Sequence, residues 1–524
     1  MHSPAHESST TVHPVRRGIL KCWRCQPRCS CSLTQTDSNA RFDPKASLLW
    51  MGVGLKPGNW STSSPASGIY RGSPFALQRR SASDCGRHRW RRAFRLSRLL
   101  QRHSMSSMDL RQVNPSGNCM TASSRVPSQP EAVRFITEHA RYDGAMPKHL
   151  LDPNVCFLNH GSFGSTPKEL LDLQTKLRHE MEREPVDFLV RTRDQRWLEA
   201  VRAVSDFLDS DPASTVFVPN ATSGINAVIN SFPWSPGDEI LTTNHRYDAV
   251  RRTLDHAALR QNLTVREADV PFPIDAPSQI ITAIEEAISP RTRMIAVDHI
   301  SSPTALISPV DAIITLARDR GLAVLIDGAH APGQVDIDLR TNPPDFWVGN
   351  LHKWLCAPKG CAVLFVEERW RDAIHPTSIS HGYSQGLHEE FSWTGTLDPT
   401  AIMCAKPAIE LHNEQGGDAF RDAHHRLVQH GRRVIADALA VDLPHPDDPH
   451  LYAAMATVPL PMPAERTDDL WMALRKCHNI EVPIIPWQGK AWVRISGYAA
   501  YNKPEQYSQL ASALTAELFN GSGE

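Results

Sequence analysis

The sequence predicts an α/β protein with a mostly parallel β-sheet covered by helices, followed by a smaller C-terminal α/β domain. Two observations favour this fold. From about residue 130, short apolar runs alternate with amphipathic helical patterns, as in parallel strands joined by helical crossovers. After residue 400 the pattern changes to a long helix and a few further strand-like runs.

Apolar runs of strand length recur through the first part of the chain. The predicted strands cover residues 215–219, 239–243, 293–298, 323–327 and 361–366. The predicted helices between them begin at residue 223 and cover residues 249–259 and 313–320. Gly321 stands where a helix C-cap is expected. Strands and helices that alternate in this way favour one sheet buried on both faces.

The C-terminal part shows a different order of elements. We expect a helix over residues 420–440, strands over 451–460 and 490–496, and a helix over 467–477. Residues 443–449 are rich in proline and predict a loop. The predicted division is an extension over residues 1–130, a large domain over 131–400 and a small domain over 401–524, to which the start of the large domain contributes.

Length and composition limit the classes of protein that fit. The chain has 524 residues, enough for two or three domains, with 41% hydrophobic and 22% charged residues. Its net charge of −1 favours neither nucleic acid nor an anionic membrane as a partner. No run approaches the roughly 20 apolar residues of a membrane span. The 11 cysteines are typical of reduced intracellular thiols, so we expect a cytoplasmic protein.

Residues 1–130 differ from the rest, because they are rich in Arg, Ser, Pro and Gly and show no lasting apolar periodicity. This composition predicts a disordered basic extension. Residues 87–100 have the pattern of a basic amphipathic helix, which would suit mitochondrial targeting, but they lie far from Met1. The alternative is an early start codon, with Met105 or Met108 as the true start.

A cluster of cysteines lies in this extension, at Cys22, Cys25, Cys29 and Cys31. Only the first pair has the spacing of a zinc ligand pair, and no second pair with such spacing follows. We therefore expect no metal site there.

Two charged residues in the large domain point to a cofactor. Asp327 ends one strand-like run, and Lys353 follows a second apolar run. Pyridoxal phosphate needs these two groups: a carboxylate pairs with the pyridine nitrogen, and a lysine amine binds the aldehyde as a Schiff base. A helix N-cap for Asp327 and an ordinary surface position for Lys353 are the alternatives.

Several motifs accompany this pair. They are residues 158–164 (LNHGSFG), 219–226 (PNATSGIN), 327–333 (DGAHAPG), 351–354 (LHKW), 357–360 (APKG), 393–396 (WTGT) and 493–496 (VRIS). In this order they resemble class V (fold type I) pyridoxal phosphate enzymes of the isopenicillin N epimerase-like subgroup. The resemblance covers about residues 150–510 and implies a seven-stranded sheet in the large domain, with pyridoxal 5′-phosphate as cofactor.

The resemblance also implies roles for residues at the reactive end of the cofactor. Lys353 is expected to carry the Schiff base and, once released, to take and return the α proton of an amino acid. Asp327 is expected to pair with the pyridine nitrogen. His330 resembles the residue that contacts the phenolic oxygen, although a histidine satisfied by backbone groups is a plain alternative.

The phosphate end is expected where a predicted strand leads into a helix. Ala221, Thr222 and Ser223 resemble the family's phosphate cradle, since a helix N-terminus offers free N–H groups to an anion. A helix cap without a ligand is the alternative. Asn350 and His352 stand where the family places further phosphate contacts. Many members carry a hydroxyl residue at the position of Asn350.

Further residues are implied around the ring and the substrate. Tyr247 aligns with the group that stacks on the ring, and His245 is a possible substitute. Arg494 resembles the arginine that binds the substrate α-carboxylate, with a surface ion pair as the alternative. Asn159 and His160 are expected to line the substrate entrance.

The resemblance implies a homodimer as well. In this family, residues at the positions of Gly395 and Thr396 reach the phosphate of the neighbouring subunit. The two active sites would then be shared between subunits.

The expected partner is a small-molecule amino-acid substrate, and several reactions remain open. A cysteine desulfurase needs a mobile cysteine before the carboxylate-binding arginine, but residues 483–490 contain none. Cys477 lies further back, and we expect it to be buried in a helix. Epimerisation at an α carbon and carbon–sulfur β-lysis of cysteine conjugates or sulfoxides, as in ergothioneine-pathway lyases, both begin with proton removal by Lys353. Epimerisation needs a second acid, which the sequence does not identify. A catalytically silent binding protein is the third reading.

Overall fold

The computed structural model describes residues 146–520. The whole predicted extension over residues 1–130, including its cysteine cluster and its basic helical pattern, therefore lies outside the described residues, as do residues 131–145 and 521–524.

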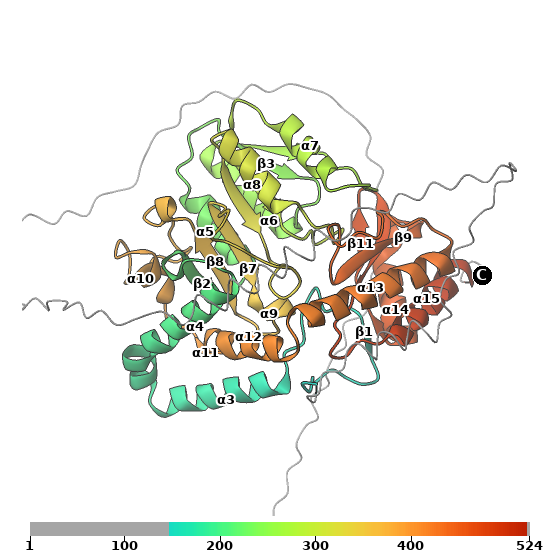
Figure 1. Ribbon diagram of the computed structural model, residues 1–524, viewed down its shortest axis with the longest axis horizontal. Helices are drawn as coiled ribbons and strands as arrows, with labels where there is room; N and C mark the ends of the chain where they lie inside the picture. The colour runs from blue at the N-terminus through green and yellow to red at the C-terminus, as the bar shows by residue number, and fades with distance from the viewer. Residues whose placement is uncertain (1–145, 521–524) are drawn as a thin grey trace, which may run out of the picture. The chain divides into compact units, whose positions relative to one another are not determined.

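The described part is built around a seven-stranded sheet in the order β2-β8-β7-β6-β5-β3-β4 (Figure 1). Its strands are β2 (Thr215–Val218), β3 (Glu239–Thr243), β4 (Thr264–Ala268), β5 (Thr292–Asp298), β6 (Ala323–Asp327), β7 (Phe346–Asn350) and β8 (Ala362–Val366). Only β8 runs antiparallel to its neighbours β2 and β7. The predicted mostly parallel, seven-stranded sheet is confirmed.

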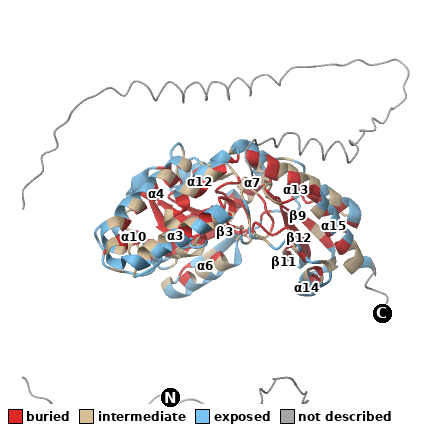
Figure 2. Cartoon of the chain, turned by 90° about the horizontal axis from the view of Figure 1, so that it is seen from below, coloured by how far each residue is buried: buried red, intermediate tan, exposed pale blue. Residues whose placement is uncertain are grey.

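Helices bury both faces of this sheet. They are α3 (Lys168–Arg183), α4 (Arg193–Phe207), α5 (Ala221–Ser231), α6 (Asp248–Gln261), α7 (Ser278–Ala287), α8 (Val310–Asp319), α9 (Leu351–Trp354), α10 (Leu387–Ser392), α11 (Thr400–Met403) and α12 (Ala405–Glu414). The same part of the chain contains the π-helix η1 (Asp187–Thr192) and the 3-10 helices η2 (Pro212–Ser214) and η3 (Glu368–Trp370). Along β2, Phe217 packs in one apolar cluster, whereas Val216 and Val218 pack in the other. Burial on both faces explains why the strands are continuous apolar runs (Figure 2).

A second layered unit follows in the chain (Figure 1). It contains α13 (Asp418–Leu439), β9 (Met455–Pro463), η4 (Ala464–Arg466), α14 (Thr467–His478), β10 (Ile480–Glu481), β11 (Ile484–Trp487), β12 (Lys490–Ser496), α15 (Pro504–Thr515) and η5 (Ala516–Asn520). Its antiparallel sheet has the order β11-β12-β9. The early strand β1 (Cys156–Phe157) pairs in parallel with β10. The start of the described chain therefore lies against its C-terminal unit.

Helices α11 and α12 belong with the first unit by packing. Ala401, Ala405 and Ala408 lie in the apolar cluster on one face of the seven-stranded sheet. The separate core of the second unit contains Leu427 and Val428 of α13, together with Cys156 and Leu158 from near the start of the described chain. The predicted domain boundaries remain a division proposed from sequence, and apart from Cys156 and Leu158 the buried residues of the second core follow residue 414.

Candidate active site

Three polar residues end neighbouring parallel strands, at the edge of the large sheet formed by the carboxyl ends of its parallel strands. They are Asp298 on β5, Asp327 on β6 and Asn350 on β7, and each is less than 10% exposed. Helix α9, which carries Lys353, begins directly after Asn350. Ligands of open α/β sheets bind at the carboxyl ends of the strands, so this edge is the candidate site.

Lys353 presents a reactive amine at this edge. Its Nζ lies 3.1 Å from Nε2 of His330. Burial lowers the pKa of Lys353 to about 8, although the nearby Asp327 carboxylate opposes this effect. The lysine therefore offers a far larger fraction of neutral amine at neutral pH than an exposed lysine does, as a nucleophile or base requires.

The backbone of Lys353 is held tightly from one side. His160 Nε2–H donates to the Lys353 carbonyl over 3.0 Å, and Tyr501 hydrogen-bonds to the other ring nitrogen. A Cβ on Gly164 would lie 2.1 Å from the same carbonyl oxygen, so only glycine fits there. The fold thus fixes the turn that carries Lys353.

His160 was predicted to line the substrate entrance, but its surroundings point to another role. The side chain is fully buried, both ring nitrogens are hydrogen-bonded, and the ring stacks on Tyr498 at 4.1 Å. This geometry favours positioning of Lys353 over contact with substrate. Asn159 is also buried, with its amide 3.5 Å from Glu481 and its Oδ1 without a partner in the described part of the chain.

Asp327 and His330 form the other side of the reactive end. Asp327 is 7% exposed, and its Oδ1 accepts the Ala329 N–H over 2.9 Å in a turn, so no helix begins there. Burial raises the pKa of Asp327. His330 Nδ1 is buried and has no partner among residues 146–520. A cationic ring nitrogen and a phenolic oxygen would satisfy these two groups, so the pair fits pyridoxal phosphate.

The predicted phosphate cradle lies at the N-terminus of α5. The Asn220 side chain accepts the Ser223 N–H over 2.9 Å, and Asn350 Oδ1 accepts the Ala221 N–H over the same distance. Two of the first N–H groups are therefore already occupied, which leaves Thr222 as the open position of the cradle. Asn350 contacts the cradle itself, so the geometry favours support of the loop over a direct phosphate contact.

His352 lies on α9 and is partly buried. Its Nδ1–H donates to the Cys361 carbonyl over 2.8 Å, and burial lowers its pKa to about 4. The ring is therefore neutral at physiological pH, with Nε2 unprotonated. A positively charged imidazole for the phosphate is not available unless the ligand itself raises this pKa.

Arg494 on β12 brings a buried cation to the same site from the second unit. It is 3% exposed, and Nη1 donates to the Ser302 carbonyl over 2.6 Å, while Nη2 donates to Ser162 Oγ over 2.8 Å. Its Nε has no partner, and it forms no ion pair in the described residues. Burial lowers the pKa of Arg494 to about 10, which leaves it charged at neutral pH. Such a cation needs an anion, and a ligand carboxylate would supply it.

The structure separates the two candidates for the ring stack. Tyr247 stands at the N-cap of α6, is 45% exposed and raises the pKa of Arg494 through its charge interaction. His245 is 4% exposed; its Nε2–H donates to the Val270 carbonyl and its Nδ1 accepts from Thr304. Only Tyr247 is free to meet a ligand.

Three residues of the site were missed in the sequence. Asp298 ends β5 next to Asp327, Ser302 receives Arg494 through both its carbonyl and its hydroxyl, and Ser162 receives the other arm of Arg494. The sequence did show that Asp298 ends a predicted strand, as Asp327 does. Ser162 lies in the motif of residues 158–164, but its role, like that of Ser302, depends on contacts between distant segments.

The loop with Gly395 and Thr396 lies beside the cradle side of α5. Gly395 and Ser223 line one cavity of about 370 Å³, and Thr396 is exposed. A role of Thr396 toward a second subunit stays a prediction.

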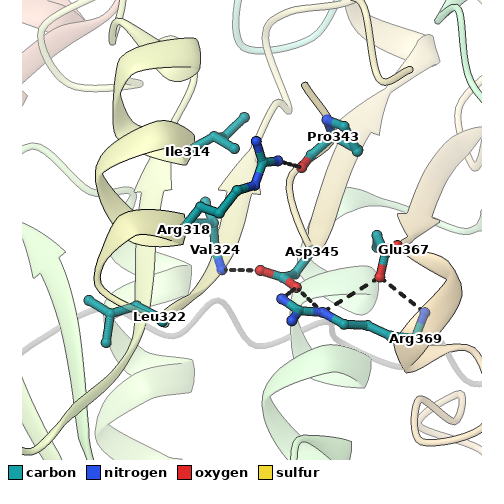
Figure 3. Close-up of a pocket in the computed structure, with 9 residues that line it drawn as sticks. Ile314, Arg318, Leu322, Val324, Pro343, Asp345, Glu367 and Arg369 are labelled. Atoms are coloured by element: carbon teal, nitrogen blue, oxygen red, sulfur yellow. Dashed lines mark hydrogen bonds and ion pairs between the residues drawn. The ribbon is translucent and has the colours of Figure 1, made fainter. Parts of the chain in front are cut away.

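Another cavity, of about 340 Å³, lies at the opposite edge of the sheet, near the amino ends of β6 and β7 (Figure 3). Its buried carboxylate, Asp345, accepts the Val324 N–H over 2.8 Å and is paired with Arg369. Trp370 Nε1 also donates to Asp345 over 2.6 Å. The Asp345 carboxylate therefore already has hydrogen-bond donors and a cationic partner, and these contacts hold the strand ends together. The carboxylate is not left without a partner that a ligand would have to supply.

The expected burial of Cys477 was wrong. Cys477 is exposed in the last turn of α14, beyond Leu474, the last buried position of that helix.

The hairpin between β11 and β12 carries Trp487 near its tip, and the indole donates to the Asn244 carbonyl over 3.2 Å. The hairpin is thus fixed to the loop that holds Tyr247.

Comparison with known proteins agrees with this geometry. The aminotransferase class-V family pattern matches residues 183–484. Isopenicillin N epimerase of Streptomyces clavuligerus is 31% identical over 72% of this chain and 98% of its own. Hercynylcysteine sulfoxide lyase of Schizosaccharomyces pombe is 27% identical over 72% and 98%, and an L-cysteine desulfhydrase of Arabidopsis thaliana is 26% identical over 76% and 95%.

Solved structures show the same fold. A complex of the cystine C–S lyase C-DES with cysteine persulfide has a TM-score of 0.58 at 21% identity, covering 69% of this chain and 97% of its own. The apo cysteine desulfurase of Thermococcus onnurineus has a TM-score of 0.58 at 19% identity, over 76% and 100%. With an amine, a buried carboxylate and a cradle gathered at the expected sheet edge, the chain belongs to the aminotransferase class-V family of pyridoxal phosphate enzymes.

Proposed function

We propose that this enzyme is a carbon–sulfur β-lyase acting on an S-substituted cysteine or its sulfoxide. Lys353 removes the α proton, and Arg494 binds the α-carboxylate. The observation that carries the proposal is the meeting of Lys353, with its lowered pKa, and Arg494, a buried cation without a carboxylate partner. An α-amino acid supplies the matching groups.

The residues that would hold the cofactor are those at the sheet edge. Asp327 would pair with the ring nitrogen, His330 with the phenolic oxygen, and Thr222 at the start of α5 with the phosphate. Bound pyridoxal phosphate supplies an electron sink that makes the α proton acidic. The buried position of Asp327 supports this assignment, because a carboxylate there is costly unless a cation meets it.

The substrate would be oriented from two directions. Arg494 presents a planar fork already aligned by Ser162 and Ser302, which lowers the entropy lost on binding a carboxylate. Tyr247 would cover one face of the ring. Lys353 would take the α proton, and the bound cofactor would supply the electron sink for the bond that breaks.

Carbon–sulfur cleavage fits a site with one base. Lys353 takes the α proton, and the electron pair left at the α carbon expels the sulfur substituent from the β carbon. Water then converts the remaining dehydroamino acid to pyruvate and ammonia. One amine on one face is enough for this reaction, and the names of the lyase and desulfhydrase relatives support it.

Epimerisation at the α carbon is the second candidate. The isopenicillin N epimerase relative, at 31% identity, favours it. It needs a proton donor on the face away from Lys353. Tyr247 is the described residue that suits this role, because its side chain is 45% exposed and lies close enough to Arg494 to affect its pKa.

We also propose a homodimer. Three large apolar side chains are more than half exposed, and they or the residues next to them line the same cavity as Gly395: Val190, Ile379 and Leu397. Their burial against a second copy would bring Thr396 toward the partner's cradle. Sedimentation velocity tests this proposal, and a protein that stays monomeric at micromolar concentration would contradict it.

Among the described helices, none is both long and apolar enough to span a bilayer. Cys156, Cys356, Cys361 and Cys404 are free buried thiols. These thiols support the proposal of a reducing, cytoplasmic setting.

The proposed reaction is tested with a panel of L-amino acids, cysteine S-conjugates and cysteine sulfoxides. Pyruvate, D-isomer and keto acid are measured separately, with Lys353→Ala as the inactive control. We expect pyruvate and the sulfur product from at least one sulfur substrate. A D-isomer without pyruvate would establish epimerisation instead. Turnover by Lys353→Ala at the wild-type rate would contradict the role of the lysine.

A further inference from the structure

A second buried carboxylate lies beside Asp327 and has no place in the proposed mechanism. Asp298 ends β5 and pairs in register with Asp327 at the end of β6, and it is 5% exposed. Residues in register on neighbouring parallel strands project from the same face of a sheet. Two carboxylates in such a position are costly, so a compensating role is expected for Asp298.

The groups that face Asp298 come from two other parts of the site. The backbone N–H groups of Tyr247 and Ser302 face its carboxylate. Tyr247 is the proposed ring stack at the start of α6, and Ser302 accepts Arg494 Nη1 through its carbonyl over 2.6 Å. Asp298 therefore lies where the ring stack and the carboxylate-binding residue meet.

The same two loops are linked by a further contact. Ser301 Oγ donates to the His245 carbonyl over 2.9 Å, and the His299 N–H donates to the Asp327 carbonyl over 2.8 Å. The loop after β5 is thus tied both to the loop before α6 and to the end of β6. The side chain of Asp298 faces both the loop before α6 and the loop after β5.

The proposed role of Asp298 does not depend on a negative charge. Burial raises the pKa of Asp298 well above its usual range, and the neighbouring Asp327 raises it further. Its oxygens therefore matter as hydrogen-bond acceptors, whereas its negative charge is disfavoured. Asparagine keeps one such oxygen and loses the charge, whereas alanine loses both.

We propose that Asp298 is a positioning residue. It accepts hydrogen bonds from the backbone N–H groups of Tyr247 and Ser302, and these bonds hold Tyr247 and Arg494 in place beside Asp327. The proposal rests on the proposed function, because it assigns Asp298 a role in binding an amino-acid substrate.

Two variants of Asp298 test this role in the full-length holoenzyme. Asp298→Ala is expected to raise KM for the amino-acid substrate about tenfold, as the loss of hydrogen bonds that align a charged group does, while the absorbance band of the attached cofactor remains. Asp298→Asn is expected to return KM to within about threefold of the wild type. If Asp298→Ala fails to fold, Asp298→Glu, which displaces the oxygens, is expected to raise KM in its place.

Asp345→Asn is the matched control. Asp345 is also buried, 7% exposed, but it stands just before β7, at the end of that strand away from Asn350, beside Val324 and Arg369 (Figure 3). Its loss should lower the melting temperature and leave KM unchanged.

Two results would overturn the proposal: a wild-type KM in Asp298→Ala, or an Asp298→Asn variant as impaired as Asp298→Ala. Failure of the proposed function is distinguishable, because the wild-type protein would then release no pyruvate from any sulfur substrate, whereas failure of the role of Asp298 leaves pyruvate release by the wild type intact.

Discussion

Arg494 depends for its role on the shape of its side chain. Arg494→Lys keeps a positive charge but loses the fork that contacts Ser162 and Ser302. We expect KM for the amino-acid substrate to rise about 10- to 100-fold, with the cofactor band retained. Steady-state kinetics with absorbance spectra measure both quantities.

Arg369→Lys provides the comparison, since Arg369 lies at the other edge of the sheet and should leave KM unchanged. An Arg494→Lys variant with the wild-type KM would show that the substrate carboxylate binds elsewhere.

The lowered pKa of Lys353 predicts how fast apoprotein captures its cofactor at different pH. Only the neutral amine attacks the aldehyde. The pKa of about 8 means that the neutral fraction rises with pH up to about 8 and then levels off. Below that, the capture rate should fall about tenfold per pH unit. Stopped-flow absorbance of apoprotein mixed with pyridoxal phosphate gives the profile, and a rate still rising steeply at about pH 10 would contradict it.

At the residue scale, the sequence alone indicated those candidate residues that stand in a recognisable motif or at the end of an apolar run. Asp327 was visible at the end of an apolar run and Lys353 in its motif. The burial of His160 was not visible, because it results from packing against Tyr498 and Tyr501, far along the chain. Asn350 likewise could not be seen to bond Ala221, since that contact joins β7 to α5.

The loop of residues 159–164 is the element that fixes the short helix α9. Gly164→Ala would place a Cβ 2.1 Å from the Lys353 carbonyl oxygen. We expect a loss of about 1–3 kcal/mol in the free energy of unfolding, together with a lower kcat, because α9 must shift. Urea denaturation and kinetics measure the two effects.

Gly321→Ala is the control for Gly164→Ala, because it strains the backbone without pushing on the turn that carries Lys353. Gly321 has a φ of +67° with no atom near a built Cβ. This variant should lose stability but keep its kcat. Equal kcat in Gly164→Ala and the wild type would show that the loop does not position Lys353.

Elements with strong apolar runs were predictable, and others were not. Strands β3 and β6 have the bounds expected, because both are buried on each face. Strand β4 escaped notice, since it lies at the sheet edge and most of its residues are exposed or half-buried. Helix α3 has few buried positions, Leu170 and Gln174, so its amphipathic pattern was weak. Strand β9 starts at Met455 instead of residue 451, because Leu451 closes a turn with Asp448.

At the scale of the whole molecule, the site joins two units of the chain. Lys353, Asp327 and the cradle come from the first unit, and Arg494 comes from the second. Residues 1–104 supply none of the proposed site residues. We therefore expect a protein that starts at Met105 to fold, to bind pyridoxal phosphate and to turn over substrate as the full chain does. Circular dichroism, absorbance and kinetics check this, and loss of cofactor binding on truncation would contradict it.

The central claim is that Lys353 holds the cofactor. Borohydride reduction of the purified holoenzyme fixes the cofactor to its lysine, and peptide mass spectrometry then identifies that residue. The account predicts the reduced phosphopyridoxyl mass on Lys353. The same mass on Lys359, whose amine contacts the Gly164 carbonyl, or on any other lysine, would contradict it.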